Sequence, residues 1–429
     1  MSQTVAKILL SLTMSFPLLL NGQSEVDHYL SVEYSYGKSQ HLPSLVTNNF
    51  NDFELNKNYS DLWIQGGFQI SEKLSYRGSL QLTDKPHALI ATKFSRPDFL
   101  LSTGRFQQSV VNFSSGNFKT SIGRDNMLSE EGITLSMFDY PRSGDGFSWS
   151  YAWNAWTFKH VFQVLPAEEA NGVVFRRSVS YHHLARNVGN FSFGVGEYFI
   201  LTGEDIGFDL KRLNPFLPYS LNSHDSEGNY YSGFSGDADN AVIKAFLNWK
   251  HKNSTATVSV YIDEFHIDGY DREVYNDAIL LSLSGATQQK IYGVENNLKI
   301  GFSISNPNFG QHPGPFTSLT FARYPLLGYL PGMKQLLYVE DTALFTKSLT
   351  ASLGGIAERW VPISMIAPPK MNDRTQLDSL VEYSDYRITL GINYAVNQTP
   401  FRMGVRGWLG SDERSSSGSL ISLYYLLEN

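Results

Sequence analysis

The sequence predicts an all-β protein, a transmembrane outer-membrane β-barrel of roughly 16–18 antiparallel strands with small helical or loop elements plugging its lumen. Two observations predict this class. Apolar and small or polar residues alternate in short segments along most of the chain, and an apolar N-terminal segment is typical of an export signal. Composition agrees, because 14% of the residues are aromatic and only 17% are charged, against about a quarter charged in soluble proteins.

The first 24 residues have the three parts of a signal peptide. Lys7 supplies a positive charge, residues 8–20 form an apolar run, and Gly22 and Ser24 suit a cleavage site. That run of about 13 residues is shorter than the roughly 20 that a membrane-spanning helix needs. We therefore expect a signal peptide at 1–24, a barrel domain at 25–429 and an outer-membrane location.

The alternation has a period of two, which places every second side chain on the same face of a strand. In residues 147–153 aromatic residues alternate with small ones, and in 388–394 aliphatic and aromatic residues alternate with small or polar ones. One face of such a strand suits lipid and the other suits a watery lumen. The same pattern recurs at residues 30–36, 74–82, 118–122, 191–195, 258–262, 298–302, 349–353 and 401–405.

The links between these segments differ in length. Short polar links at 70–73 and 188–190 are typical of periplasmic turns. Links at 205–240, 305–315 and 362–378 are long, and long barrel loops face the outside. No shift in composition divides the chain after residue 25, so a single domain is expected.

Residues 324–337 lack the alternation. We expect them to form a small helix that lies in the lumen or across one of its mouths.

Motifs for catalysis and for cofactors are absent from the sequence. It contains no G-x-S-x-G, no G-x-x-x-x-G-K-[ST] and no H-E-x-x-H. His182 and His183 are adjacent, so they point to opposite faces of a strand and cannot jointly hold a metal. The acidic residues of 225–240 do not match the twelve-residue calcium loop, which favours a solvated loop. We expect no enzyme activity, no metal and no cofactor.

Charge and cysteine content exclude other classes. The net charge is −7 without a cluster of Lys or Arg, so nucleic acid is not an expected partner. The chain has no cysteine and therefore neither a disulfide nor a cysteine-borne lipid anchor.

Glu197 ends an apolar series, in phase with Phe191, Phe193 and Val195. A charged side chain on the lipid face costs a few kcal/mol near the bilayer centre. We therefore expect Glu197 above the lipid band or near its rim.

An ordered series of short motifs across about 180–270 resembles the capsule assembly protein Wzi family. An upstream segment, Gly123-Arg124-Asp-Asn, also resembles that family's glycine–arginine segment. The motifs of the series are Tyr181-His-His183-Leu-Ala-Arg186, Gly194-Val-Gly-Glu197, Leu213-Asn214-Pro215-Phe216, Gly236-Asp-Ala-Asp239-Asn240 and Tyr261-Ile-Asp-Glu264-Phe-His-Ile-Asp268.

The resemblance implies a barrel of about eighteen strands with helical elements blocking the periplasmic side. It also implies a lectin-like role, the attachment of capsular or exopolysaccharide at the cell surface without catalysis. The other expected partners are outer-membrane lipid and, during insertion, the barrel-assembly machinery. The candidate polysaccharide-binding or family-motif residues are His183, Arg186, Glu197, Asn214, Pro215, Tyr230, Tyr231, Asp239, Asn240 and Glu264.

Structural roles are an alternative for these residues. Asn214 and Pro215 can simply shape a loop, and Glu197 and Arg186 can form an ion pair inside the lumen. Two other functions also suit such a barrel, because one fold hosts many functions. One is a porin or substrate-specific channel, and the other is an outer-membrane enzyme that modifies lipid or glycan.

Overall fold

The computed structural model describes residues 28–39, 58–83, 103–128, 143–170, 173–203, 238–264, 278–306, 309, 320–321, 324–325, 333–361, 382–395, 401–411 and 418–428. These residues are almost entirely antiparallel strand and include no helix. Accordingly, no helix that is long and apolar enough to cross a membrane occurs among them. The expected signal peptide, residues 1–24, lies outside the described residues.

The described strands vary in length, and eighteen of them belong to one sheet. Their bounds are β1 His28–Ser39, β2 Asn58–Ser71, β3 Leu74–Thr83, β4 Thr103–Ser115, β5 Phe118–Asp125, β6 Gly144–Trp153, β7 Trp156–Ala170, β8 Val173–Val188, β9 Phe191–Gly203, β10 Ala238–His251, β11 Ser254–Glu264, β12 Ala278–Ile291, β13 Val294–Ser305, β14 Thr320–Phe321, β15 Tyr324–Pro325, β16 Met333–Thr346, β17 Leu349–Trp360, β18 Tyr383–Ala395, β19 Phe401–Ser411 and β20 Gly418–Glu428.

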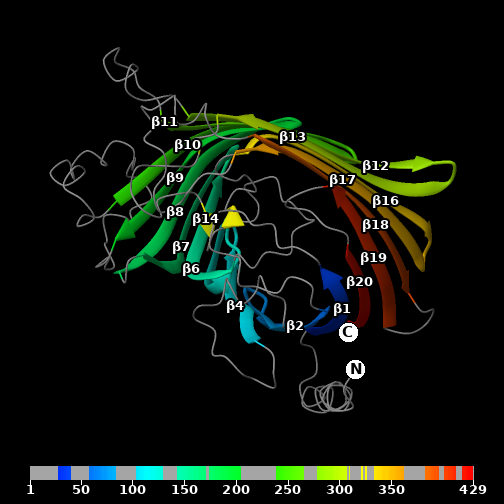
Figure 1. Ribbon diagram of the computed structural model, residues 1–429. Coiled ribbons are helices and arrows are strands. Elements are labelled where there is room, and N and C mark those ends of the chain that lie inside the picture. The colour runs from blue at the N-terminus through cyan, green and yellow to red at the C-terminus, as the bar shows by residue number, and fades with distance from the viewer. Residues whose placement is uncertain are drawn as a thin grey trace.

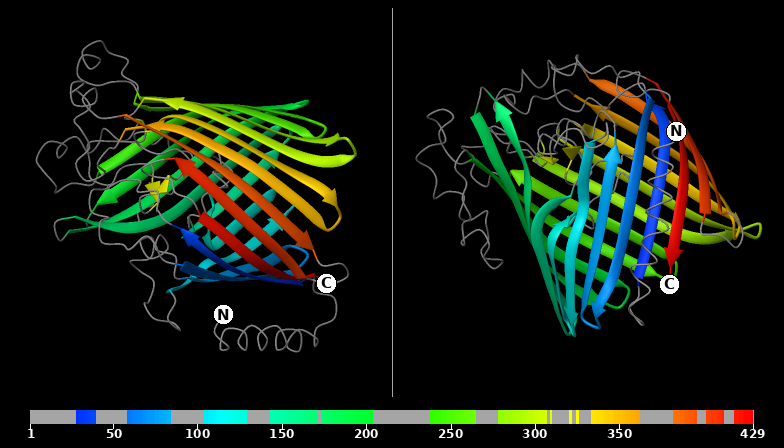
Figure 2. Two further views of the ribbon diagram at one scale, coloured as in Figure 1. Left: turned by 45° about the vertical axis from the view of Figure 1, so that its right-hand side comes forward. Right: turned by 90° about the horizontal axis from the view of Figure 1, so that it is seen from below.

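Each strand of the sheet pairs with the strand before it and the strand after it, as in a meander (Figure 1). The first strand joins the last, since Tyr34 of β1 lies opposite Leu62 of β2 on one side and opposite Leu423 of β20 on the other. Figure 2 shows β1 between its two partners. The order of strands therefore returns to its start, as in a barrel, and the prediction of 16–18 strands is confirmed.

Seven described links at one end of the barrel, here called the turn end, are two-residue turns. They are 72–73, 116–117, 154–155, 189–190, 252–253, 292–293 and 347–348. Gly189 has a φ of 57°, a left-handed conformation that suits glycine. The turns expected at 70–73 and 188–190 are confirmed. The opposite end is called the loop end, and the long links expected there fall mostly outside the described residues, except that 238–240 begin β10 and Ser305 ends β13.

The helix expected at 324–337 is wrong wherever the structure describes these residues. Tyr324–Pro325 pairs with Thr320–Phe321 as a small separate ladder, and Met333 begins β16. The alternation is hidden in β16 because both of its faces are apolar. Leu336 is buried on one face, while Leu337 is 44% exposed on the other.

The two faces of the barrel wall differ in exposure. The outer face shows large apolar side chains, such as Ile388, Leu390 and Ile392, which are about half exposed. The inner face carries a buried apolar cluster that includes Tyr198, Tyr261 and Leu336. Link residues join this cluster, namely Met127 and Leu128 after β5 and Phe309 after β13. Loop residues therefore fill part of the lumen near the loop end.

Candidate functional site

A row of inward-facing residues crosses five strands of the barrel wall. The register places Lys159 of β7 opposite His183 of β8 and His183 opposite Gly196 of β9. Gly196 lies opposite Lys244 of β10, which in turn lies opposite Tyr261 of β11. We call these five residues the lumen row. Paired residues of neighbouring strands point to the same face of a sheet, so the row lines the lumen.

Glycine on β9 lets the side chains of β8 and β10 meet. A Cβ added to Gly196 would lie 2.9 Å from the His182 carbonyl oxygen and 2.9 Å from the His183 Cβ. A Cβ added to Gly194 would lie 2.8 Å from the Phe246 ring. All three distances are shorter than a side-chain carbon normally reaches. As a result, the rings of His183 and Phe246 contact each other across β9, edge to face, with centroids 5.7 Å apart.

Hydrogen bonds and ring contacts orient the side chains of the lumen row. The Tyr181 hydroxyl lies 2.8 Å from Nδ1 of His183, within hydrogen-bond distance. Lys244 Nζ lies 5.0 Å from the centroid of the Phe246 ring and 5.5 Å from that of Tyr261, in cation–π geometry. Tyr181, Lys244 and Tyr261 are buried, whereas His183 and Phe246 are partly exposed. A buried layer thus supports two side chains that a ligand in the lumen can reach.

The chemistry of this row suits a polyhydroxylated ligand. Ammonium and imidazole groups hydrogen-bond to hydroxyl or carboxylate oxygens, and an aromatic ring offers an apolar face beside them. Ligand sites commonly combine apolar walls with a few fixed polar groups. Among the described residues, no group of three or more His, Cys, Asp or Glu is arranged to hold a metal ion.

Two pairs of opposite charge also lie on the inner face of the described wall. Arg77 Nη2 lies 3.4 Å from Oδ2 of Asp125, and the Gln108 amide donates to Oδ1 of Asp125. Lys299 Nζ lies 3.7 Å from Oε2 of Glu340. These pairs make parts of the lumen wall polar and charged.

Of the residues expected from the sequence, His183 is part of the lumen row, and His182 and His183 do point to opposite faces as expected. Glu197 faces outward, in the middle of the 13-residue strand β9. It directly follows the exposed apolar residues Phe191, Phe193 and Val195 on this face. Glu197 is 5% exposed, and its Oε2 lies 3.4 Å from Nε2 of His182. The imidazole of His182 offsets part of the cost of burying this carboxylate.

The alternative ion pair between Glu197 and Arg186 in the lumen is wrong. Arg186 faces outward near the turn end, and its guanidinium lies 5.4 Å from the centroid of the Trp156 ring. The guanidinium stacks on an aromatic side chain at the position where barrels place their interfacial aromatic residues.

The remaining candidates are only partly described. Asp239 and Asn240 begin β10 and lie opposite Leu201 and Ile200 of β9. Glu264 ends β11, after a register shift that places it opposite Ala278. Asn214, Pro215, Tyr230 and Tyr231 lie outside the described residues.

Sequence reasoning missed Lys159, Lys244 and Phe246. The signal was present, because Gly194 and Gly196 are two inward glycines at a spacing of two. Such glycines in a strand mark a place where something approaches the backbone closely. Opposite Gly196 lie His183 of β8 and Lys244 of β10, and opposite Gly194 on β10 lies Phe246.

No family model matches the sequence, and no curated protein matches it. Solved structures of similar fold include Wzi from Escherichia coli, described as a carbohydrate-binding β-barrel involved in group 1 capsule assembly. It has 10% identity and a TM-score of 0.55, over 97% of this chain and 87% of Wzi. OccK9 from Pseudomonas aeruginosa has 9% identity, covers 94% and 99%, and gives a TM-score of 0.52. OccAB4 from Acinetobacter baumannii has 10% identity and a TM-score of 0.51, over 96% of this chain and 100% of OccAB4.

These similarities establish the fold and not a family. The structural neighbours are outer-membrane proteins, and the chain has the fold of an outer-membrane β-barrel.

Proposed function

We propose that this barrel binds capsular or exopolysaccharide and holds it at the cell surface without catalysis. The observation that carries the proposal is the lumen row, in which Lys159, His183 and Lys244 lie in one line beside the ring of Phe246. The ordered motifs across 180–270 support it, as does the structural similarity to the carbohydrate-binding barrel Wzi.

The row suits an extended chain of sugars better than a single small ligand. Neighbouring strands are about 4.8 Å apart, so Lys159 of β7, His183 of β8 and Phe246 of β10 offer contacts at several points along one direction. A polymer can engage several such contacts at once. The overall affinity then rises with the number of weak contacts, because every contact after the first is intramolecular.

The test is direct binding. The full-length barrel in detergent is titrated with surface polysaccharide purified from the same cells, and the heat of binding is measured. Phe246→Ala removes the aromatic face, and we expect binding to weaken by about 1–2 kcal/mol, the range for a desolvated aromatic contact. The control is Lys347→Gln, in the turn that joins β16 and β17. Equal affinity of the Phe246→Ala variant and the control would contradict the proposal, and chromatography of the recovered polymer checks for cleavage.

A second candidate function is a channel. Its support is the charged lumen wall, with Arg77 near Asp125 and Lys299 near Glu340, together with the similarity to the Occ porins. Conductance in planar bilayers distinguishes the two functions. A steady open conductance favours transport, whereas a closed lumen with polysaccharide binding favours attachment.

A further inference from the structure

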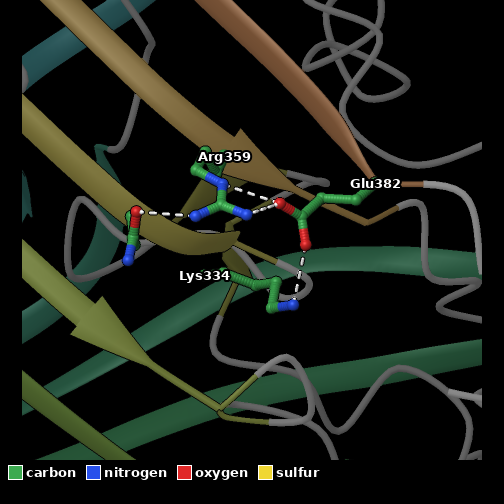
Figure 3. A network of polar contacts seen from close by, with 4 residues as sticks. Lys334, Arg359 and Glu382 are labelled. Atoms are coloured by element: carbon green, nitrogen blue, oxygen red, sulfur yellow. Dashed lines mark hydrogen bonds and ion pairs between the residues drawn. The ribbon is translucent and has the colours of Figure 1, made fainter. Parts of the chain in front are cut away.

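At the loop end, two cations share one carboxylate on the outer side of the barrel. Glu382, just before β18, accepts a hydrogen bond from Nζ of Lys334 at 2.8 Å and from Nε of Arg359 at 2.6 Å. Arg359 Nη1 also donates to the Gln335 side chain at 3.4 Å. Figure 3 shows Lys334 and Arg359 converging on Glu382 from the ends of two neighbouring strands. We call Lys334, Arg359 and Glu382 the cationic rim.

The cationic rim keeps a positive charge that solvent can reach. Two cations and one carboxylate leave a net charge of about +1. The side chains of Arg359 and Lys334 are 49% and 38% exposed, whereas that of Glu382 is 28% exposed. Lys334 lies at the register shift between Met333 and Gln335, where a bulge re-aims side chains.

Directly beside the rim, the same outer face becomes apolar. Arg359 pairs with Gln335 and Ser384, and the next row on this face contains Leu337 and Tyr386. Both of these side chains are about half exposed. Farther along the strands the exposed apolar residues continue as Val339, Ile388, Leu353 and Leu390.

That order of residues, charged, then aromatic, then aliphatic, is the order of a membrane interface. Tyrosine marks the headgroup level of a bilayer, and aliphatic residues mark its hydrocarbon. The rim therefore lies where the headgroup of a lipid meets the barrel. Since long barrel loops face the outside, this is the outer surface of the outer membrane.

We propose that the cationic rim and the apolar wall beside it bind one lipid that carries a phosphorylated headgroup. Guanidinium and ammonium groups are well suited to phosphate oxygens, and arginine can donate two parallel hydrogen bonds to them. The acyl chains of the same lipid lie along Leu337, Tyr386 and Ile388. Glu382 holds the two cations in place and competes with the phosphate for them.

The experiment uses the full-length barrel in detergent with two probes, bisphosphorylated lipid A and the same lipid after dephosphorylation. Native mass spectrometry counts the bound lipid as its concentration is raised. The expected result is tighter binding of the phosphorylated probe, with a loss of about fivefold for each of Lys334→Gln and Arg359→Gln. The matched control is Lys347→Gln, which removes a cation at the other end of the same hairpin.

Glu382→Gln distinguishes binding from a purely structural role. It removes the competing carboxylate, so the phosphorylated probe should bind more tightly, although the barrel loses an ion pair. Weaker binding in this variant, or equal binding of the two probes by the unaltered barrel, overturns the proposal. If Arg359→Gln does not fold, the affinities of Lys334→Gln and Glu382→Gln for the two probes still test the proposal.

A competition experiment distinguishes a lipid headgroup from free phosphate as the ligand. Inorganic phosphate is added at the concentration of the lipid headgroups. We expect no displacement of the lipid, since the apolar wall holds its acyl chains. Full displacement shows that the rim binds a free anion and overturns the lipid assignment.

Discussion

Gly196 allows us to test whether the lumen row is packed as closely as described. In Gly196→Ala the new Cβ would lie 2.9 Å from the carbonyl oxygen of His182, 2.9 Å from Cβ of His183 and 3.1 Å from the ring of Tyr181. The first of these atoms is backbone within a paired strand and cannot move aside cheaply. Overpacking of this kind costs about 1–3 kcal/mol. We therefore expect the free energy of unfolding to fall by that amount.

The measurement is urea unfolding of the barrel in lipid vesicles, followed by tryptophan fluorescence. The matched control is Gly285→Ala in β12, where the new Cβ would lie 3.3 Å from the Thr255 carbonyl oxygen and 3.8 Å from Ile300. Because this contact is less severe, alanine should cost less stability here than at Gly196, and glycine's own weakening of a strand offsets part of that cost. Equal stability of the two variants would refute the close packing of the row around β9.

Three further outcomes are expected. Tyr181→Phe removes the hydroxyl that bonds to His183, and it should lower stability by about 0.5–1.5 kcal/mol in urea unfolding and weaken polysaccharide binding. Arg186→Ala removes the cation over Trp156, and it should cost about 0.5–1 kcal/mol of stability, without any change in polysaccharide binding. Hydrogen bonds from Lys334 and then Arg359 hold the pKa of Glu382 below its usual value of 4.5. A lowered pKa means that this stabilisation is present above about pH 4.5 and is lost as the pH falls through the folded-state pKa. The melting temperatures of the unaltered barrel and the Glu382→Gln variant should thus differ at pH 7 and converge in acid; a constant difference would contradict the assignment.

Alternation in the sequence was sufficient to predict the strands, because one face of most strands is apolar and the other is small or polar. Residues 388–394, for example, lie in β18 with their apolar side chains outward. The same rule failed at residues 333–337, where Leu336 and Leu337 are apolar on both faces of β16. A period of two cannot be seen in a strand that is buried on one side and faces lipid on the other.

The site was harder to predict, because it depends on register between strands. His183 could be assigned to the lumen from its phase alone. Its neighbours Lys244 and Phe246 lie about sixty residues farther along the chain, and only the pairing of β8, β9 and β10 brings them together. Glu197 illustrates the same dependence on tertiary structure. Its outward phase was correct, but the burial that pairs it with His182 depends on tertiary packing.

The most direct test of the central claim measures where the polysaccharide goes. The gene is deleted, and cell-bound and released polymer are quantified at equal total synthesis, with the unaltered gene or the Phe246→Ala variant restored. If the barrel holds polymer through the lumen row, deletion shifts polymer to the medium, the unaltered gene returns it and the variant does not. An unchanged ratio of cell-bound to released polymer after deletion would contradict attachment and leave transport as the leading function.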